Sequence, residues 1–212
     1  MALDKEIIAG KVLGQGQRPA WLISQPDIGG VTLQNPDYAN WPMDKRIEEA
    51  KKLLAEAGFN ASHPLRFNLL YNTSESHQRI AIAASSMWKK NLGVEAKLQN
   101  QEWKTMLDTM HTHDFDAVRY AWIADYDDAA TFLNNFRTGD SENTSQYSNP
   151  EYDQALVNAA KAKTPAERGK FYQQAEDLLA RDVPAIPVYH YVRTHLVKPW
   201  VGGFTPDKLG YY

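Results

Sequence analysis

The chain has 212 residues, of which 43% are hydrophobic and 23% are charged, and its formal net charge is -3. That length can supply the apolar core of one large domain or of two small ones. Because the chain has no cysteine, disulfides and thiolate metal sites are excluded, and the slightly acidic charge argues against a protein that binds nucleic acid through its phosphates.

The N-terminal fifth of the chain predicts a short helix and then a long extended loop. Residues 3–13 have the pattern of a short helix that follows a polar turn. Four prolines and the pair Gly29-Gly30 in residues 14–42 exclude a continuous helix, and two tryptophans indicate an ordered loop. The first eleven residues lack the apolar region of a signal peptide, and no run of about 18 apolar residues could span a bilayer.

The middle of the chain alternates between helical and extended patterns. Asp44 is the expected N-cap of a helix that ends at Gly58. An acidic turn at residues 125–128 precedes a short helix that ends near Phe136. The remaining helices are expected at residues 76–92 and 103–114, and the strands at residues 65–72, 94–101 and 115–125. This alternation is typical of βαβ units, so we expect an α/β fold.

The C-terminal third predicts two helices and an extended end. A polar loop, GDSENTSQYSNP, precedes helices expected at residues 150–161 and 166–181. Thr164 and Pro165 separate these helices, because threonine is a good N-cap and proline suits a first helical turn. Residues 185–199 alternate as an extended segment with a proline that favours a sheet edge, and a loop-like tail follows.

Arg119, Trp122 and Asp125 form the first candidate site, in the segment VRYAWIADYDD. On a strand, Arg119 and Asp125 would share one face and Trp122 would point to the other. Asp125 stands where the strand should end, and open α/β sheets bind ligands there. Its carboxylate could receive an ammonium group, and the arginine could hold a carboxylate. Alternatively, Asp125 opens the turn and caps the next helix, with Arg119 as its structural partner.

The six histidines raise the question of a metal site. The stretch HTHDFD brings imidazoles and carboxylates close in sequence, but His111 and His113 are two residues apart and would not share a helix face. We therefore expect both to be solvated, and we expect no metal or other cofactor. The usual hydrolase and nucleotide-binding motifs are absent, so a hydrolase would need an arrangement without a known motif.

Five of the six tryptophans fall at or near the ends of predicted segments. They are Trp21, Trp41, Trp103, Trp122 and Trp200. Such positions suit the rim of a ligand pocket, where a large apolar ring carries one hydrogen-bond donor, but each ring could equally fill a core.

Four segments resemble the oligopeptide-binding proteins of bacterial peptide ABC importers in order and spacing. They are LLYNTSESHQ, NLGVEAKLQNQEWKTMLDT, WIADYDD and AIPVYHYVRTHLVKPWVGG. The resemblance runs over essentially the whole chain and implies one lobe of a two-lobed periplasmic receptor, with a mixed sheet flanked by helices. It implies two partners, a short oligopeptide and the importer's membrane permease. It also implies a function without catalysis, nucleic acid or membrane insertion.

The resemblance further implies that residues 1–212 are the C-terminal ligand-binding lobe of such a receptor. The family's signal peptide, N-terminal lobe and extreme C-terminus are then expected to lie outside this chain. One lobe offers half of the enclosing surface, so we expect the chain alone to bind peptides weakly or not at all.

The resemblance assigns charged groups to the two ends of the ligand. Asp125, in the element W-x-A-D, is expected to grip the α-ammonium group, which favours the ligand-binding alternative for this residue. Arg119, together with His77 in the element N-T-S-x-x-H, is expected to help neutralise the ligand carboxylate.

The remaining assignments concern the walls of the site. Trp103 and Trp122 are expected at side-chain pockets, with Asn72 near the ligand. Ile123 stands where a close relative has cysteine, which should slightly reshape a pocket. Met110 stands where similar chains often carry a basic residue, which predicts a change in the ligand lengths or acidic side chains that are recognised.

Three alternatives stay open at this point. The same architecture could bind another solute, such as a murein peptide, haem or a nickel complex. A metal-assisted hydrolase would use the histidines, His77 among them. An interaction module would pair with itself through an exposed aromatic cleft.

Overall fold

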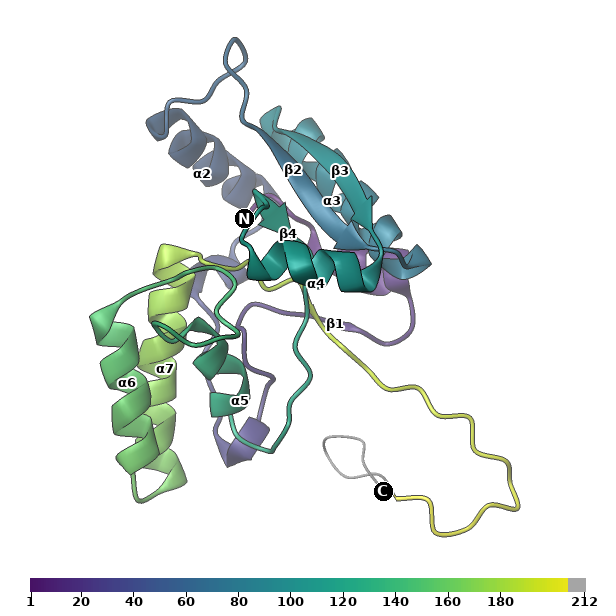
Figure 1. Cartoon of the computed structure of the whole chain (residues 1–212), viewed down its shortest axis with the longest axis vertical. Coiled ribbons are helices and arrows are strands. Elements are labelled where there is room, and N and C mark those ends of the chain that lie inside the picture. The colour runs from purple at the N-terminus through teal and green to yellow at the C-terminus, as the bar shows by residue number, and fades with distance from the viewer. Residues whose placement is uncertain (206–212) are drawn as a thin grey trace. The chain divides into compact units, whose positions relative to one another are not determined.

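The computed structural model describes residues 1–205 of the chain (Figure 1). The chain divides into two compact units, which are described separately. Unit 1 comprises Met1–Pro19 and Asp37–Ala121, and unit 2 comprises Ala20–Pro36 and Trp122–Tyr212. Each unit is therefore built from two separate stretches of sequence, and one boundary between the units falls between Ala121 and Trp122, inside the first candidate site.

Unit 1 contains the βαβ pattern that the sequence predicts. Its elements are α1 (Lys5–Ile7), the π-helical turn η1 (Ile8–Leu13), β1 (Arg18–Pro19), η3 (Asp37–Asn40), α2 (Met43–Glu56), β2 (Arg66–Asn72), α3 (Glu75–Leu92), β3 (Glu95–Gln101), α4 (Trp103–His111) and β4 (Ala117–Val118). The expected helix at residues 3–13 is thus a short α-helix continued by a π-helical turn, and the α/β fold class is confirmed.

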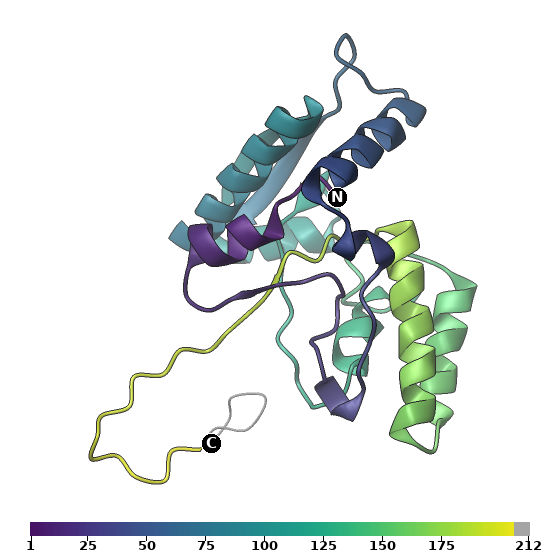
Figure 2. The same cartoon turned by 180° about the vertical axis from the view of Figure 1, so that it is seen from behind.

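Three parallel strands form the sheet of unit 1, in the order β3-β2-β4. Leu69 and Tyr71 of β2 pack with Ala81 of α3 on one face of the sheet. Leu70, between them in sequence, packs with Met106 of α4 on the other face. The two helices cover opposite faces of the sheet (Figures 1 and 2), and this explains why the middle of β2 is a continuous apolar run rather than an alternating one.

Two details of unit 1 differ from the sequence prediction. Helix α2 begins at Met43 after Pro42 in the N-cap position, so the assignment of Asp44 as the N-cap was wrong, and Asp44 lies in the first turn. The strand expected at residues 115–125 is also wrong beyond Ala117–Val118. Only two residues of β4 pair with β2, at Leu69 and Leu70, and the chain then leaves the sheet. An alternating sequence becomes a strand only over the length that a neighbouring strand can pair.

Unit 2 is built around an antiparallel pair of helices. Its elements are η2 (Ile28–Gly30), α5 (Ala130–Leu133), η4 (Asn134–Phe136), α6 (Pro150–Lys161), α7 (Pro165–Asp182) and β5 (Tyr189–His190). The side chains of Asn149 and Thr164 accept hydrogen bonds from backbone N–H groups in the first turns of α6 and α7, and proline follows each cap. The core of the unit joins the apolar faces of α5, α6 and α7 to Ile28 and Val31.

The C-terminal extended segment forms less strand than the sequence predicts. Of residues 185–199, only Tyr189–His190 is a strand, because an extended sequence forms one only where it pairs with another segment. The expected loop-like tail lies partly outside the described residues, from residue 206 onward. Within residues 1–205, no helix combines the length and the apolar character needed to cross a membrane.

Candidate functional site

In unit 1 the candidate residues gather at the carboxyl end of the parallel sheet. Asn72 is the last residue of β2 and pairs in register with Gln101, the last residue of β3. Trp103 begins α4 two residues later, and Arg119 directly follows β4, where its backbone N–H donates to the Leu70 carbonyl at 2.7 Å. Because the strands are parallel, their carboxyl ends meet at one edge, which is the usual ligand-binding edge of an α/β sheet.

His77 contacts both Asn72 and Arg119 at this edge. His77 lies in the first turn of α3, and its Nδ1 is 2.7 Å from Oδ1 of the buried Asn72. The same Nδ1 is 3.4 Å from Nη1 of Arg119. The three residues come from the end of β2, the start of α3 and the end of β4, so the fold brings together side chains that are up to 47 positions apart.

The charge of this cluster at neutral pH comes from the arginine. Partial burial and, to a smaller extent, the positive charge of Arg119 together lower the pKa of His77 to about 4. A cation beside an imidazole disfavours protonation, since two positive charges would then face each other. His77 is therefore a neutral hydrogen-bonding group at pH 7, and Arg119 supplies the positive charge for an anionic ligand group.

Trp103 forms the aromatic side of the same edge. Its ring stacks on Tyr120, with centroids 6.3 Å apart and an interplanar angle of 12°, and the residue is 45% exposed. The Glu102 carboxylate accepts from the backbone N–H of Lys104 at 2.8 Å, which fixes the start of α4 and so the position of Trp103. Sequence reasoning missed Tyr120, because nothing in the local pattern distinguishes a stacked ring from a core ring.

In unit 2 the candidate residues lie on an irregular segment. Ala124 is buried, while Ile123 is 60% exposed and Asp125 is exposed. Trp122 is half-buried and packs against the core of unit 2. This segment lies outside any strand, so the rule of alternating faces does not apply to Arg119, Trp122 and Asp125.

Thr131 connects two of these candidates. Its Oγ1 accepts from the backbone N–H of Asp125 at 3.0 Å and from Nε1 of Trp122 at 3.4 Å. The hydroxyl also lies 3.5 Å from Oδ2 of Asp125, to which it can donate its proton. Sequence reasoning missed Thr131 as well, because its role depends on the fold of the segment before α5.

The other two aspartates of the acidic turn are engaged in holding the fold. Asp127 Oδ1 accepts from the backbone N–H of Gly29 at 2.8 Å. Gly29 has φ of 63°, and a Cβ there would lie 3.2 Å from the Asp128 Cα, so both the turn and the close approach require glycine.

Asp128 is the centre of a polar network. It accepts from Arg168 Nη1 at 2.6 Å, from the Tyr172 hydroxyl and from the backbone N–H of Ala130 at 2.9 Å. Partial burial raises the pKa of Asp128, but these hydrogen bonds outweigh the burial and keep the pKa below its ordinary value. Asp128, and not Asp125, therefore supports the start of α5, so the alternative that Asp125 caps this helix is wrong.

The burial of three further residues bears on two expectations from the sequence. His111 and His113 are both exposed, as predicted, and residues 1–205 contain no group of three or more histidine, aspartate or glutamate side chains that could hold a metal ion. Met110 is 2% exposed and packs with Leu70 and Met106. Met110 contributes to the core of unit 1, and its expected effect on the ligand lengths or acidic side chains that are recognised stays a prediction.

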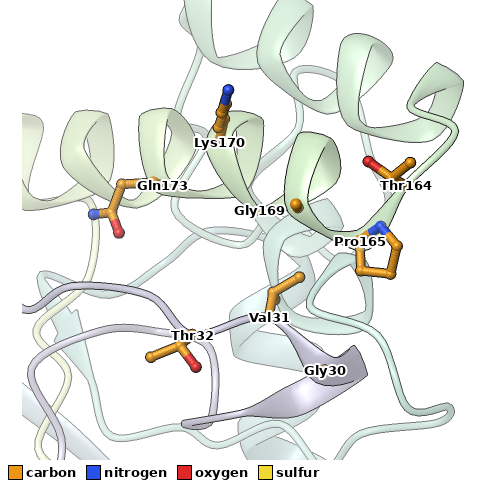
Figure 3. Close-up of a pocket in the computed structure, with 9 residues that line it drawn as sticks. Gly30, Val31, Thr32, Thr164, Pro165, Gly169, Lys170 and Gln173 are labelled. Carbon is orange, nitrogen blue, oxygen red and sulfur yellow. The ribbon is translucent and has the colours of Figure 1, made fainter.

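A separate surface pocket of about 730 Å³ lies in unit 2, between residues 30–32 and the start of α7 (Figure 3). Gly169 faces Val31 there, and a Cβ on the glycine would touch the Val31 Cγ1 at 3.4 Å. Gln173, at the pocket wall, is already hydrogen-bonded to the backbone of Gln34. None of the candidate residues lines this pocket.

Comparisons with known proteins agree on one family. The model of the bacterial extracellular solute-binding proteins, family 5 Middle, matches residues 1–144. The periplasmic oligopeptide-binding protein OppA of Salmonella typhimurium is 49% identical over 205 residues, which are 97% of this chain and 38% of that protein. The periplasmic murein peptide-binding protein MppA of Escherichia coli is 41% identical over 214 residues, 100% of this chain and 40% of that protein.

The solved structures agree with the sequence relatives. The crystal structure of Haemophilus influenzae OppA in complex with RPPGFSPFR has a TM-score of 0.90 and 45% identity, and covers 96% of this chain and 40% of that chain. The chain thus spans about two fifths of the length of the curated relatives that it matches.

Proposed function

Because this chain belongs to family 5 of the bacterial extracellular solute-binding proteins, we propose that it is the C-terminal ligand-binding lobe of a receptor for short oligopeptides. The receptor delivers the peptide to the membrane permease of an ABC importer and acts in the periplasm. It is not an enzyme and needs no cofactor. The similarity to periplasmic oligopeptide-binding proteins over 97% of the chain supports this proposal.

The observation that carries the proposal is the exposed carboxylate of Asp125, close in the chain to two aspartates whose carboxylates are bound to other parts of the fold. Asp127 accepts from the backbone N–H of Gly29 and Asp128 pairs with Arg168, so both carboxylates hold the fold, whereas the carboxylate of the exposed Asp125 lies beside the Thr131 hydroxyl. A peptide's α-ammonium group is a compact cation that forms strong, charge-assisted hydrogen bonds with such a carboxylate. Asp125 then binds the start of the peptide.

Arg119 is the matching group for the peptide's carboxylate. It belongs to unit 1 and Asp125 to unit 2, and each is held by its own unit. All peptides share their charged termini and their backbone, so recognition at these groups gives affinity that does not depend on the peptide sequence. The His77 ring, whose Nδ1 lies 2.7 Å from Asn72 Oδ1, is fixed beside the guanidinium of Arg119.

The aromatic and apolar residues serve as walls for the peptide's side chains. Trp103, with Tyr120 behind it, and Trp122 offer large flat surfaces with a hydrogen-bonding edge. Ile123, which is largely exposed, offers an apolar wall. Such walls, with bridging water, accept many side chains and leave selectivity for the peptide sequence low.

The experiment compares one tripeptide with a free amino terminus and its N-acetylated form, by calorimetry on the full-length receptor. Asp125→Asn should weaken the free peptide by roughly tenfold to a hundredfold, since a charge-assisted bond is lost. The acetylated peptide should lose little, because it carries no ammonium group. Asp177→Asn is the matched control: Asp177 is an exposed aspartate of α7, and asparagine keeps an oxygen for Gln173.

Equal losses for both peptides, or no loss for either, would contradict the ammonium role of Asp125. A murein peptide is the second candidate ligand, because the E. coli murein peptide-binding protein is 41% identical over the whole chain. Adding a murein tripeptide to the same titrations separates the candidates: it should bind more weakly than ordinary tripeptides if the proposal holds.

A further inference from the structure

Thr131 is a buried polar residue in an otherwise apolar helix. It is 3% exposed, and its neighbours Ala129, Phe132 and Leu133 all belong to the core of unit 2. A buried hydroxyl costs free energy unless it is hydrogen-bonded, and an apolar residue would pack at this position without that cost. The presence of a hydroxyl at this buried position is therefore explained by the groups to which it is hydrogen-bonded.

The neighbours of the Thr131 hydroxyl account for every hydrogen bond that it can form, two as an acceptor and one as a donor. The backbone N–H of Asp125 and the indole Nε1–H of Trp122 are both obligate donors, so Oγ1 accepts from each. The carboxylate of Asp125 is an obligate acceptor when ionised, so the single Thr131 proton points to Oδ2. One side chain thus contacts the backbone and the carboxylate of Asp125 and the ring of Trp122.

Helix α5, which carries Thr131, is anchored at both ends. At its start, the Asp128 carbonyl accepts from the Thr131 N–H at 3.2 Å, and the Asp128 carboxylate is paired with Arg168. At its end, the carbonyl of Leu133 accepts from the buried Tyr152 hydroxyl at 2.6 Å. A hydroxyl on such a fixed support can hold a flexible neighbour in one orientation.

We infer that Thr131 is the positioning residue that orients the Asp125 carboxylate for ligand binding in unit 2. This inference rests on the proposed function, in which Asp125 receives the peptide's ammonium group. The exposed carboxylate would otherwise rotate freely about its side-chain bonds, and each binding event would have to restrict it. Thr131 restricts it beforehand, because affinity rises when a binding group is already held in its bound orientation.

The test uses Thr131→Val in the full-length receptor, titrated with the free and the N-acetylated tripeptide. Valine keeps the size and branching of threonine and removes the hydroxyl. The free peptide should bind about tenfold more weakly, which corresponds to the loss of one hydrogen bond to a charged group, and the acetylated peptide should bind as before. Thr131→Ser, which keeps the hydroxyl, should restore the affinity for the free peptide to within about threefold.

Two further measurements keep the inference falsifiable. If the Thr131→Val variant does not fold, Thr131→Ala is used in its place. Thr109→Val is the matched control, because the Thr109 hydroxyl donates to a carbonyl within α4 of unit 1. In an Asp125→Asn background, Thr131→Val should cause little additional loss, since the hydroxyl acts through the carboxylate.

Wild-type affinity for the free peptide in both Thr131→Val and Thr131→Ala would overturn the inference, as would equal losses for the two peptides. Additive losses in the double variant would overturn it as well. If Asp125→Asn itself leaves the preference for the free amine intact, the proposed function fails, and that result is distinct from a failure of Thr131 alone.

Discussion

The two units hold their candidate residues by different means. In unit 1, Asn72, Trp103 and Arg119 stand at or just beyond the ends of three parallel strands, so the register of the backbone sets their positions. In unit 2, Trp122 and Asp125 lie on a segment without strand or helix, and side chains hold that segment in place.

This difference predicts how the candidate residues of each unit respond to substitution. A site at the ends of strands depends on the apolar core under the sheet and tolerates changes of polar neighbours. A site on an irregular segment depends on a few hydrogen bonds, so a single polar substitution should disturb it. The experiments below test the two dependences from the largest expected effect to the smallest.

The largest effect is expected for the core under the sheet of unit 1. Met110→Ala should lower the free energy of unfolding by about 3 kcal/mol, because it removes a buried side chain that packs with Leu70 and Met106. Urea denaturation measures the loss. Met110→Leu, which conserves volume, should cost less than about 1.5 kcal/mol. If both variants were as stable as the wild type, the core would not hold this edge of the sheet.

The next effect is expected in unit 2, at the centre of its polar network. Asp128→Ala should cost about 2 kcal/mol of unfolding free energy, since Arg168, Tyr172 and the Ala130 N–H lose their common acceptor. Asp127→Ala, which removes one exposed hydrogen bond to Gly29, should cost about 1 kcal/mol or less. Similar losses in the two variants would mean that the network is not what holds the turn.

The third effect is a pH dependence of the free energy of unfolding, caused by His77 in unit 1. The pKa of His77 is lowered from an ordinary 6.5 to about 4 in the folded chain, so the unfolded chain takes up a proton first as the pH falls. The free energy of unfolding should therefore decrease from about pH 6.5 down to about pH 4 through this residue. NMR titration of the His77 ring should give a midpoint near 4, and His77→Gln should remove this part of the pH dependence. A midpoint near 6.5 would contradict both the partial burial of His77 and its contact with Arg119.

The smallest effect is expected for the exposed ring pair. Trp103→Ala should lower the unfolding free energy by about 1 kcal/mol, because the stacking on Tyr120 is lost while the ring is already half in solvent. Trp103→Phe should retain most of that contribution. Thermal unfolding of the two variants measures the difference, and a larger loss for phenylalanine than for alanine would show that the stack does not stabilise unit 1.

The parts of the fold that the sequence predicts are those with local signals. Asn149-Pro150 and Thr164-Pro165 place the starts of α6 and α7, because cap and proline act within one helical turn. The length of β4 could not be predicted, since it depends on how far β2 can pair with it. Helix α2 starts earlier than expected because Asp44 suits a first turn as well as a cap.

The candidate site residues also divide into features that the sequence predicts and features that it does not. The types and order of Asp125, Arg119 and His77 were enough for a resemblance, but their surroundings were not predictable. Contact between His77 and Arg119 depends on the order of the strands, which brings the end of β4 beside the end of β2. Which aspartates of the acidic turn hold the fold depends on partners that are up to 98 residues away, as for Asp127 and Gly29.

The most direct test of the central claim is a crystal structure of the full-length receptor with a bound tripeptide. The account predicts that the peptide's ammonium nitrogen lies about 3 Å from a carboxylate oxygen of Asp125, within hydrogen-bonding distance. A bound peptide whose ammonium group contacts other residues, with the Asp125 carboxylate left in solvent, would contradict it.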